Sequence, residues 1–390
     1  MRLQKRIRKA LTILAVSGVM LGLGVSSVLF GACGPFTDAA GDAFCPFVLE
    51  IFYLGITTGT TATTFDPTAN VTRLQMAAFL ARTVDGALKR GGRRAVLDQF
   101  WTTQNSTVLG LTTVGVGPRL LHSDGADIWV ANADGTVSRV RASDGKLIEA
   151  WTGATNADVV RVAMGKVLVT GFTIPGNLYR IDPSQPAGAV TTVASTLGNT
   201  PAGIAFDGGR FWTANIGGGS VSIVTPGATI PWTVTTVAAG FTTPTDAMFD
   251  GSNIWISDST AGKIFKLDAA GAILQTVTTG ASPNGIIFDG SNIWVPNFAA
   301  STLSVVRASS GVVLATLTGN GLDGPGTPAF DGQRVLVTNI TGNSVSLWKA
   351  ADLSSLGNFS TGLATTPLGA CSDGIHFWIT LQAVNKLARF

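Results

Sequence analysis

The sequence predicts a mainly β protein: a seven-bladed β-propeller preceded by a small α-helical module. The segment Phe-Asp-Gly-Ser-Asn-Ile-Trp that begins at Phe288 recurs almost unchanged at Phe249, and looser copies occur elsewhere. The Trp of this segment, or the Leu that replaces it, recurs every 39 to 44 residues, at Trp129, Leu168, Trp212, Trp255, Trp294, Leu336 and Trp378. A fixed period of this length is typical of repeat architectures, and it predicts seven equivalent units.

Each unit has the pattern of a four-stranded sheet. An apolar run, an Asp-Gly turn and a second apolar run indicate a β-hairpin, and two further alternating runs follow, as at 302–306 and 312–317. Four-stranded units repeated radially describe propeller blades rather than a sandwich. The seventh unit ends at Phe390 with its third strand, whereas 107–113 resembles a fourth strand. We therefore expect a domain at 106–390 in which strand 107–113 completes the last sheet and closes the ring.

The repeated polar and aromatic positions have structural interpretations. A Trp at one register is expected to pack between neighbouring blades rather than form a sugar-binding platform. The Asn or Asp that ends each second strand is expected to hydrogen-bond the backbone of the following turn. These residues are Asn132, Asn215, Asp258, Asn297 and Asn339.

Composition excludes several classes of protein. The chain of 390 residues is 45% apolar and 13% charged and has 48 Gly, which fits strands and turns around a core rather than disorder. Five of the 26 basic residues and none of the 23 acidic residues lie in the first 32 positions, so the rest is slightly acidic. Nothing in this distribution indicates nucleic-acid binding.

The first 32 residues predict export. A basic start is followed by an apolar run from Leu11 to Ala32, which is the pattern of a signal peptide and is also long enough for a retained membrane anchor. Cys33 follows a sequence similar to a lipoprotein cleavage box. A disulfide between Cys33 and Cys45 is the competing interpretation, and Cys371 is expected to be buried. With two His and no Cys-x-x-Cys, no metal site and no cofactor are predicted.

Helical periodicity occurs only in the module at 33–90. It predicts one amphipathic helix over 46–54, ended by Gly55, and a second helix capped by Thr72. The apolar inner face of the second helix would comprise Leu74, Met76, Ala77, Phe79, Leu80 and Val84.

This module resembles the S-layer homology (SLH) domain. The resemblance rests on Phe36-Thr37-Asp38, Tyr53 to Gly59, Phe65-Asp66-Pro67 and Val71 to Leu80. It implies non-covalent attachment to a cell-wall polysaccharide or to peptidoglycan, with Arg73 contacting the acidic polymer, assisted by Thr72, Asp38 and the backbone near Gly59. A guanidinium can bind a carboxylate bidentately, which suits this role.

Two features depart from the SLH pattern. Gln75 stands where the family usually has an acidic residue, and the module occurs once rather than in tandem. An alternative is that Arg73 only pairs with Asp38 or caps a helix inside the module. The basic segment 91–105 that follows is interpreted as a solvated linker, or else as a second contact to anionic polymer.

The propeller has a family resemblance of its own. Residues 129–132 and 336–347 look like YVTN repeats, and the hairpins resemble those of NHL-like and streptogramin-lyase-like propellers. Such propellers include scaffolds, binding modules, lactonases and lyases, so the resemblance implies fold more than function. We assign no catalytic residue, because neither His122 on a first strand nor His376 in a hairpin lies in the loops that open the channel.

The loops that lead into the first strands carry the candidate ligand site. Arg119, Asp158, Asp246 and Asn284 occupy comparable positions and would surround the channel mouth, where a small ligand could bind. The alternative is that they are solvated turn residues.

The interpretation favoured by the sequence is an exported cell-envelope protein whose SLH-like module binds wall polymer. Its propeller would display a surface for an unidentified protein or small molecule. The alternatives are an envelope-tethered propeller enzyme of the lyase or lactonase type and an architectural surface-layer component.

Overall fold

A computed structural model describes residues 33, 35–39, 44–53, 56–80, 83 and 110–390. The chain divides into two compact units, Met1–Gly91 and Gly92–Phe390. The predicted export segment 1–32, the predicted linker 91–105 and residues 107–109 of the predicted closing strand lie outside the described residues. Among the residues described, no helix combines the length and the apolar character that spanning a bilayer requires.

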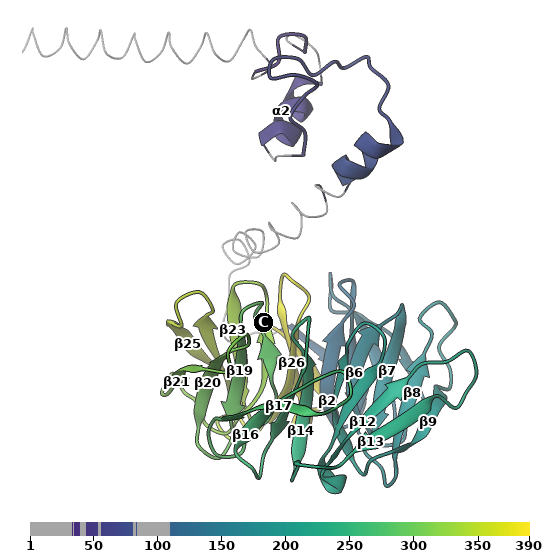
Figure 1. The fold of residues 1–390 in the computed structure, drawn as a ribbon, viewed down its shortest axis with the longest axis vertical. Helices are drawn as coiled ribbons and strands as arrows, with labels where there is room; N and C mark the ends of the chain where they lie inside the picture. Colours follow the sequence, from purple (N-terminus) through teal and green to yellow (C-terminus); the bar gives the residue numbers. More distant parts are fainter. Residues whose placement is uncertain (1–32, 34, 40–43, 54–55, 81–82, 84–109) are drawn as a thin grey trace, which may run out of the picture. The chain divides into compact units, whose positions relative to one another are not determined.

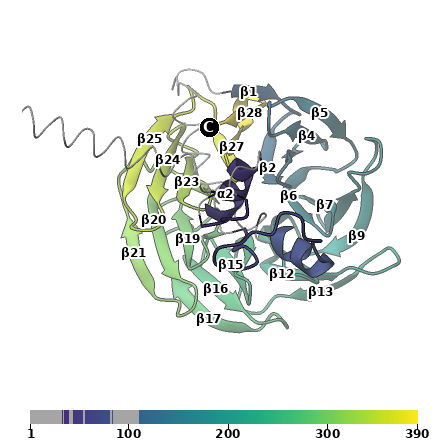
Figure 2. The same ribbon diagram turned by 90° about the horizontal axis from the view of Figure 1, so that it is seen from above.

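The second unit is a propeller of seven four-stranded sheets around a central axis (Figure 1, Figure 2). The innermost strands are β2 (Pro118–Ser123), β6 (Ala157–Ala163), β10 (Pro201–Phe206), β14 (Pro244–Phe249), β18 (Ile287–Phe288), β22 (Pro325–Phe330) and β26 (Pro367–Ser372). The second strands are β3 (Asp127–Asn132), β7 (Lys166–Gly171), β11 (Phe211–Asn215), β15 (Ile254–Asp258), β19 (Asn292–Asn297), β23 (Arg334–Asn339) and β27 (Phe377–Leu381).

The outer half of each sheet follows the same order. The third strands are β4 (Val137–Arg141), β8 (Gly176–Ile181), β12 (Ser220–Thr225), β16 (Lys263–Leu267), β20 (Thr302–Arg307), β24 (Ser344–Lys349) and β28 (Lys386–Arg389). The outermost strands are β5 (Leu147–Trp151), β9 (Thr191–Leu197), β13 (Thr233–Val237), β17 (Ile273–Thr278), β21 (Val313–Leu317), β25 (Ser355–Ser360) and, in the seventh sheet, β1 (Gly110–Thr113). Two short 3-10 helices, η1 (Ile216–Gly218) and η2 (Gln382–Val384), follow second strands.

The seventh sheet joins the two ends of the propeller. Strand β1 pairs antiparallel with β28, from Gly110 opposite Arg389 to Thr113 opposite Lys386. Figure 2 shows these two strands side by side. A second connection lies near the axis, where the Thr380 hydroxyl donates to the Arg119 carbonyl at 2.6 Å. The prediction of seven sheets is confirmed, and the seventh is completed from the start of the domain.

The repeated Trp explains how neighbouring sheets pack. Trp129 is fully buried and contacts Ala157 and Val160 of the next sheet, so the predicted packing between blades is confirmed. Its indole N–H also donates to the Asp of the preceding Asp-Gly turn. This bond is 2.7–2.8 Å long in all five Trp-containing sheets, with Asp124, Asp207, Asp250, Asp289 and Asp373 as acceptors. In these five sheets one carboxylate therefore joins the turn to the core.

The two sheets with Leu lack this bond. In the sixth sheet Asp331 instead accepts from the Arg334 guanidinium at 2.7 Å. In the second sheet Met164 and Gly165 form the turn, both with positive φ. Burial of Leu168 and Leu336 retains the apolar contact without the polar bond.

The Asn that ends a second strand makes a wider set of bonds than predicted. Asn297 accepts from the backbone N–H of Gly280 at 3.0 Å. It donates to the hydroxyls of Thr302 at 3.0 Å and Ser304 at 2.9 Å, which belong to the third strand. The residue thus joins the second and third strands of its sheet to the loop that enters the sheet, and it is structural.

The first unit has a small core of its own. Phe36, Ala39 and Val48 are buried with Cys33, which forms a disulfide with Cys45 at the start of α2 (Cys45–Tyr53). Residues 73–80 are helical.

The prediction that the apolar face of this second helix is buried is wrong. Leu74 is 84% exposed, Met76 48% and Leu80 59%, because the core closes around Phe36, with Phe52 and Phe65 against it, and does not include them.

Candidate functional site

The channel mouth is built by bulges at the start of the innermost strands. In six of the seven sheets the pairing of the first strand with the second shifts register within its first residues, as between Pro118 and Leu121. A bulge leaves a residue outside the ladder and redirects its side chain. This places Arg119, Asp158 and Asn284 at one position of three sheets, whereas Asp246 lies one residue further along its strand.

All four residues predicted for this site line one cavity. It has a volume of about 340 Å³ and is also lined by Phe172, Ile216 and Gln382, which follow second strands. Close approach of the inner strands narrows the site. A Cβ on Gly203 would lie 2.5 Å from the Asp246 Cα, and one on Gly369 would lie 2.6 Å from the Arg119 carbonyl oxygen. Glycine at these two positions therefore permits the sheets to meet around the cavity.

Arg119 and Asp158 form an ion pair across the first and second sheets. The Arg119 Nη1 donates to Asp158 Oδ1 at 2.7 Å, and its guanidinium lies 5.4 Å from the centre of the Phe172 ring. Burial raises the pKa of Asp158 to about 6, although the Arg119 charge and its hydrogen bond act in the opposite direction. The Asp158 carboxyl can therefore exchange a proton close to neutral pH.

Asp246 is the second carboxyl of the cavity and is half-buried. Its oxygens accept the backbone N–H groups of Ala247 at 2.8 Å and Ile286 at 2.9 Å. Burial raises the pKa of Asp246 to about 7, against those two hydrogen bonds and the charge of Arg161, while the charge of Asp158 adds to the increase. The two carboxyls of this cavity thus titrate closer to neutral pH than an ordinary aspartate does.

Arg161 and His122 are two further polar groups on the first strands. From its place in the sequence His122 is not assigned a catalytic role, and Arg161 is not among the predicted site residues. They occupy the same register position of the first and second sheets, opposite Trp129 and Leu168. The Arg161 Nη1 lies 3.3 Å from His122 Nε2, which must accept because a guanidinium only donates. His122 Nδ1 is buried and has no partner among the described residues. Burial and the Arg161 charge lower the pKa of His122 to about 3, so this ring is neutral.

Asn284 is held by its backbone. Its N–H donates to the Pro296 carbonyl at 3.0 Å, and its carbonyl accepts the Ser257 hydroxyl at 2.6 Å. These bonds leave its side-chain amide directed to the cavity that it lines. Within the described ranges, no group of three His, Cys, Asp or Glu side chains is placed to hold a metal ion.

The residues to which the SLH resemblance gives a polymer contact have different surroundings. Asp38 accepts the backbone N–H groups of Phe65 at 2.9 Å and Asp66 at 2.6 Å, which lowers the pKa of this exposed carboxyl. Gly59 has φ +80°, and a Cβ there would lie 2.4 Å from the Phe36 ring. Asp38 and Gly59 therefore shape the loops of the module.

Thr72 and Arg73 begin the helix at 73–80. The Thr72 hydroxyl accepts the N–H of Gln75 at 3.2 Å, and the Gln75 side chain accepts the N–H of Thr72 at 2.8 Å. This is a reciprocal capping box, in which Gln replaces the acidic residue. Arg73 is exposed, and within the described residues it has no ion pair with Asp38. The alternative of an Arg73–Asp38 pair is therefore wrong.

The cysteines differ in environment. The disulfide between Cys33 and Cys45 leaves no thiol at Cys33. Cys371 is a free thiol on β26 that packs against buried residues such as Leu121 and Trp378, and burial raises its pKa.

Comparison with known proteins assigns the module and the fold. Residues 35–77 match the S-layer homology domain. No curated protein matches the sequence. The propeller resembles virginiamycin B lyase from Staphylococcus aureus, with 16% identity, a TM-score of 0.60 and coverage of 72% of this chain and 99% of that chain. It also resembles a streptogramin B lyase, with 15% identity, a TM-score of 0.60 and coverage of 72% and 96%.

A third similar structure is hydrazine synthase from Kuenenia stuttgartiensis, with 15% identity, a TM-score of 0.61 and coverage of 73% of this chain and 98% of that chain. At these identities the similarity shows the fold alone. The chain therefore combines an SLH domain with a seven-bladed propeller. SLH domains bind cell-wall polymers, which associates this chain with the cell surface.

Proposed function

We propose that this is an exported cell-envelope protein whose SLH domain binds an acidic wall polysaccharide or peptidoglycan through Arg73. Its propeller is the displayed binding scaffold. The observation that carries the proposal is the SLH match at 35–77 together with an exposed Arg73 in the first turn of a capped helix. Arg73 has no ion pair among the residues that the structure describes, and its guanidinium can form a bidentate ion pair with a carboxylate or phosphate of the polymer.

Co-sedimentation with isolated cell-wall sacculi tests the anchoring. The parent chain is expected to pellet with the sacculi, and Arg73→Ala is expected to lower the affinity at least about tenfold, since a charge-assisted contact is lost. Arg141→Ala is the matched control, because Arg141 is an exposed arginine of the propeller that pairs with Asp144. Sacculi stripped of attached polysaccharide separate the two polymers: retained binding indicates peptidoglycan. Equal pelleting of Arg73→Ala and the parent would contradict the proposal.

The channel mouth supports a second candidate function, the binding or turnover of a small polar ligand. Asp158 and Asp246 are carboxyls with pKa values raised to about 6 and about 7, and a carboxyl in that range can act as a general acid or base. Arg119 and Asn284 line the same cavity and could orient an oxygen-rich ligand. Similar structures include enzymes named as streptogramin B lyases, which makes ring-opening elimination or lactone hydrolysis the reaction to test first.

The assay follows consumption of streptogramin B and of a simple lactone by the parent and by the Asp158→Asn and Asp246→Asn double variant. If the propeller is an enzyme, the parent should consume the substrate, and the double variant should do so at least about a hundredfold more slowly, as expected for removal of an acid or base. Turnover that is absent or unchanged in the variant removes the enzymatic candidate. An ordered assembly of the pure protein in light scattering would favour the architectural alternative instead.

A further inference from the structure

Two hollows lie side by side on the propeller face that carries the Asp-Gly turns of the fourth to sixth sheets. Their volumes are about 750 Å³ and about 730 Å³. Both are lined by Ser291, Asn292, Ala350 and Ala351, so they form one continuous depression, called the turn groove below. The channel-mouth cavity lies at the other end of the inner strands and shares no lining residue with the turn groove.

The two hollows contain equivalent groups from neighbouring sheets. Each has a half-buried phenylalanine at the end of a first strand, a polar side chain at the start of a second strand, and a cation at the end of a third strand. These are Phe288, Asn292 and Arg307 in the first hollow and Phe330, Arg334 and Lys349 in the second. The register is also equivalent, since Arg307 lies opposite Asn292 and Lys349 lies opposite Arg334. A ligand with a repeating structure would meet the same groups twice.

The free charge in the turn groove is positive. Asp289 lines it, but its Oδ1 accepts two backbone N–H groups, at 2.8 and 2.7 Å, and its Oδ2 accepts the Trp294 indole at 2.7 Å. The Arg307 guanidinium has no hydrogen bond or ion pair among the described residues. Lys266 donates to the Ala308 carbonyl at 3.1 Å, which leaves its ammonium further N–H donors. Asp250 also lines the groove, and its oxygens are bonded to two backbone N–H groups and to the Trp255 indole in the same way. Lys349 is bonded to Asp352 at 3.0 Å in an exposed ion pair, and its ammonium keeps further N–H donors. An anionic ligand therefore finds unpaired donors at Arg307 and Lys266 and shares the ammonium of Lys349 with Asp352.

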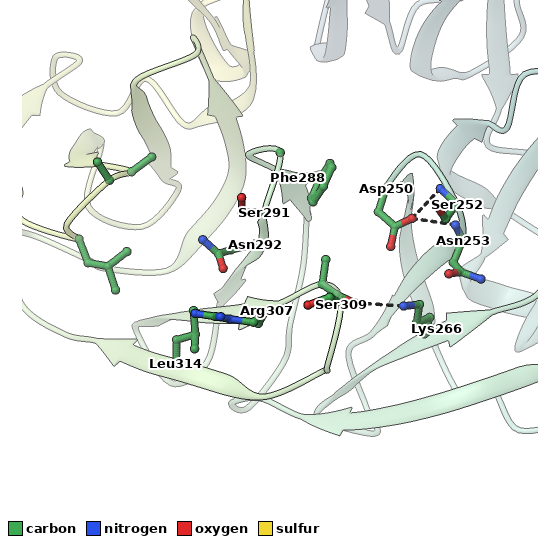
Figure 3. Close-up of a pocket in the computed structure, with 15 residues that line it drawn as sticks. Asp250, Ser252, Asn253, Lys266, Phe288, Ser291, Asn292, Arg307, Ser309 and Leu314 are labelled. Carbon is green, nitrogen blue, oxygen red and sulfur yellow. Dashed lines mark hydrogen bonds between the residues drawn. The ribbon is translucent and has the colours of Figure 1, made fainter.

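The close-up in Figure 3 shows Phe288, Asn292 and Arg307 around the first hollow, with Lys266 bonded to the loop that carries Ser309. The lining between the cations is rich in hydroxyl and amide groups, including Ser252 and Ser291. Such groups both donate and accept, as binding of sugar hydroxyls requires. The groove crosses turns and does not follow an unpaired strand edge, so it offers no ladder to an extended peptide.

We propose that the turn groove binds an extended acidic polysaccharide. Carboxylates on successive sugars pair with Arg307 and Lys349, and the sugar rings lie against Phe288 and Phe330. The turn amides and hydroxyls bind the sugar hydroxyls. This site is separate from the SLH domain, so one chain would contact envelope polymer at two places and gain avidity from both.

The test uses the full chain carrying Arg73→Ala, so that the SLH contribution is removed, and isothermal titration with a polygalacturonate oligosaccharide. In this background the added pair Arg307→Ala and Lys349→Ala is expected to weaken binding at least about tenfold. The pair should also reduce the salt dependence of the affinity. Arg141→Ala is the matched control, because Arg141 ends the third strand of the first sheet as Arg307 does in the fifth, and it should change nothing.

Four outcomes would overturn this proposal: no binding by the Arg73→Ala chain at millimolar oligosaccharide, equal affinity of the Arg307 and Lys349 double variant, equal affinity for uncharged dextran, or equal affinity for polyglutamate. Unchanged melting temperatures show that the variants are folded. The two proposals can fail separately. If Arg73→Ala loses sacculus binding and the groove variants do not change the affinity for polygalacturonate, the groove proposal is wrong and the SLH anchor stands.

Discussion

Two groups of aspartates lie at opposite ends of the inner propeller strands and have opposite surroundings. The turn aspartates, such as Asp289, use both oxygens in bonds to backbone N–H groups and to a buried indole. The channel aspartates, Asp158 and Asp246, are less fully bonded; Asp158 has one ion pair, to Arg119, and Asp246 accepts two backbone N–H groups. The same side chain thus stabilises the turns at one end and provides protonatable groups at the other.

The pKa shifts have opposite signs in the two groups. Burial acts to raise the pKa of Asp124, Asp207 and Asp373, but hydrogen bonds from the indole and the turn backbone outweigh it, so these values fall below the ordinary 3.8. At Asp158 and Asp246 burial prevails, and the values rise to about 6 and about 7. The number of bonds to the carboxylate, more than its depth, separates structural from reactive positions.

The largest expected effect on stability concerns the indole that donates to the aspartate of an Asp-Gly turn. Trp294→Ala removes a fully buried side chain and its bond to Asp289, and it should lower the free energy of unfolding by about 3–5 kcal/mol. Urea denaturation measures this change. Trp294→Phe, which keeps most of the packing, should lose less; equal losses in both variants would assign the effect to the hydrogen bond alone.

The channel aspartates predict a pH effect of the next size. The pKa values of Asp158 and Asp246 in the folded protein exceed the ordinary 3.8. The two carboxyls therefore contribute their full stability below about pH 3.8, and this contribution is lost as the pH rises through about 6 and about 7. The pKa of His122 shifts in the opposite direction, to about 3, so its effect on stability has the opposite pH dependence. The quantity to measure is therefore the difference in free energy of unfolding between the parent and a variant that both retain His122. Relative to the parent, the Asp158→Asn and Asp246→Asn double variant should gain on the order of 2–4 kcal/mol between pH 4.5 and 7.5. A constant difference across this range contradicts the raised pKa values.

The carboxylate of a turn should matter less than its indole. Asp289→Ala leaves the Trp294 indole N–H and two backbone N–H groups without their acceptor, which should cost about 2 kcal/mol. Asp144→Ala, in an exposed turn, is the control and should stay within about 0.5 kcal/mol. If Asp289→Ala and Asp144→Ala have the same melting temperature, the turn aspartates are not structural.

The smallest stability effect is expected at Arg73. Its exposed side chain should contribute less than about 0.5 kcal/mol to folding, although its loss should weaken wall binding at least about tenfold. Thermal unfolding of Arg73→Ala checks this separation of stability from binding. A large drop in melting temperature would show that Arg73 supports the module.

Periodicity was sufficient to predict the ring, its number of sheets and the donated strand, because seven copies of one pattern repeat the same information. Loop position alone also brought Arg119, Asp158, Asp246 and Asn284 to one cavity. The proximity of His122 and Arg161 was not predicted because both lie within strands. A polar residue in a strand is interpreted as solvent-exposed unless the register of the two sheets is known. The occurrence of His122 and Arg161 at the same place in two first strands was the available signal.

The bond between each turn Asp and the Trp five residues later could have been inferred from their constant spacing, since both recur in five units. The helix at 73–80 shows a limit of periodicity. Leu74, Met76 and Leu80 have the spacing of a buried face and are exposed, since periodicity reports which side is apolar but not whether a partner covers it.

The claim on which the rest depends is that the channel mouth holds carboxyls chemically distinct from the structural aspartates of the turns. Site-resolved NMR titration of the aspartate carboxyl carbons in the folded protein tests it directly. The account predicts midpoints of about 6 for Asp158 and about 7 for Asp246, with Asp124, Asp207 and Asp373 titrating below 3.8. Midpoints for Asp158 and Asp246 at or below 3.8 would contradict it.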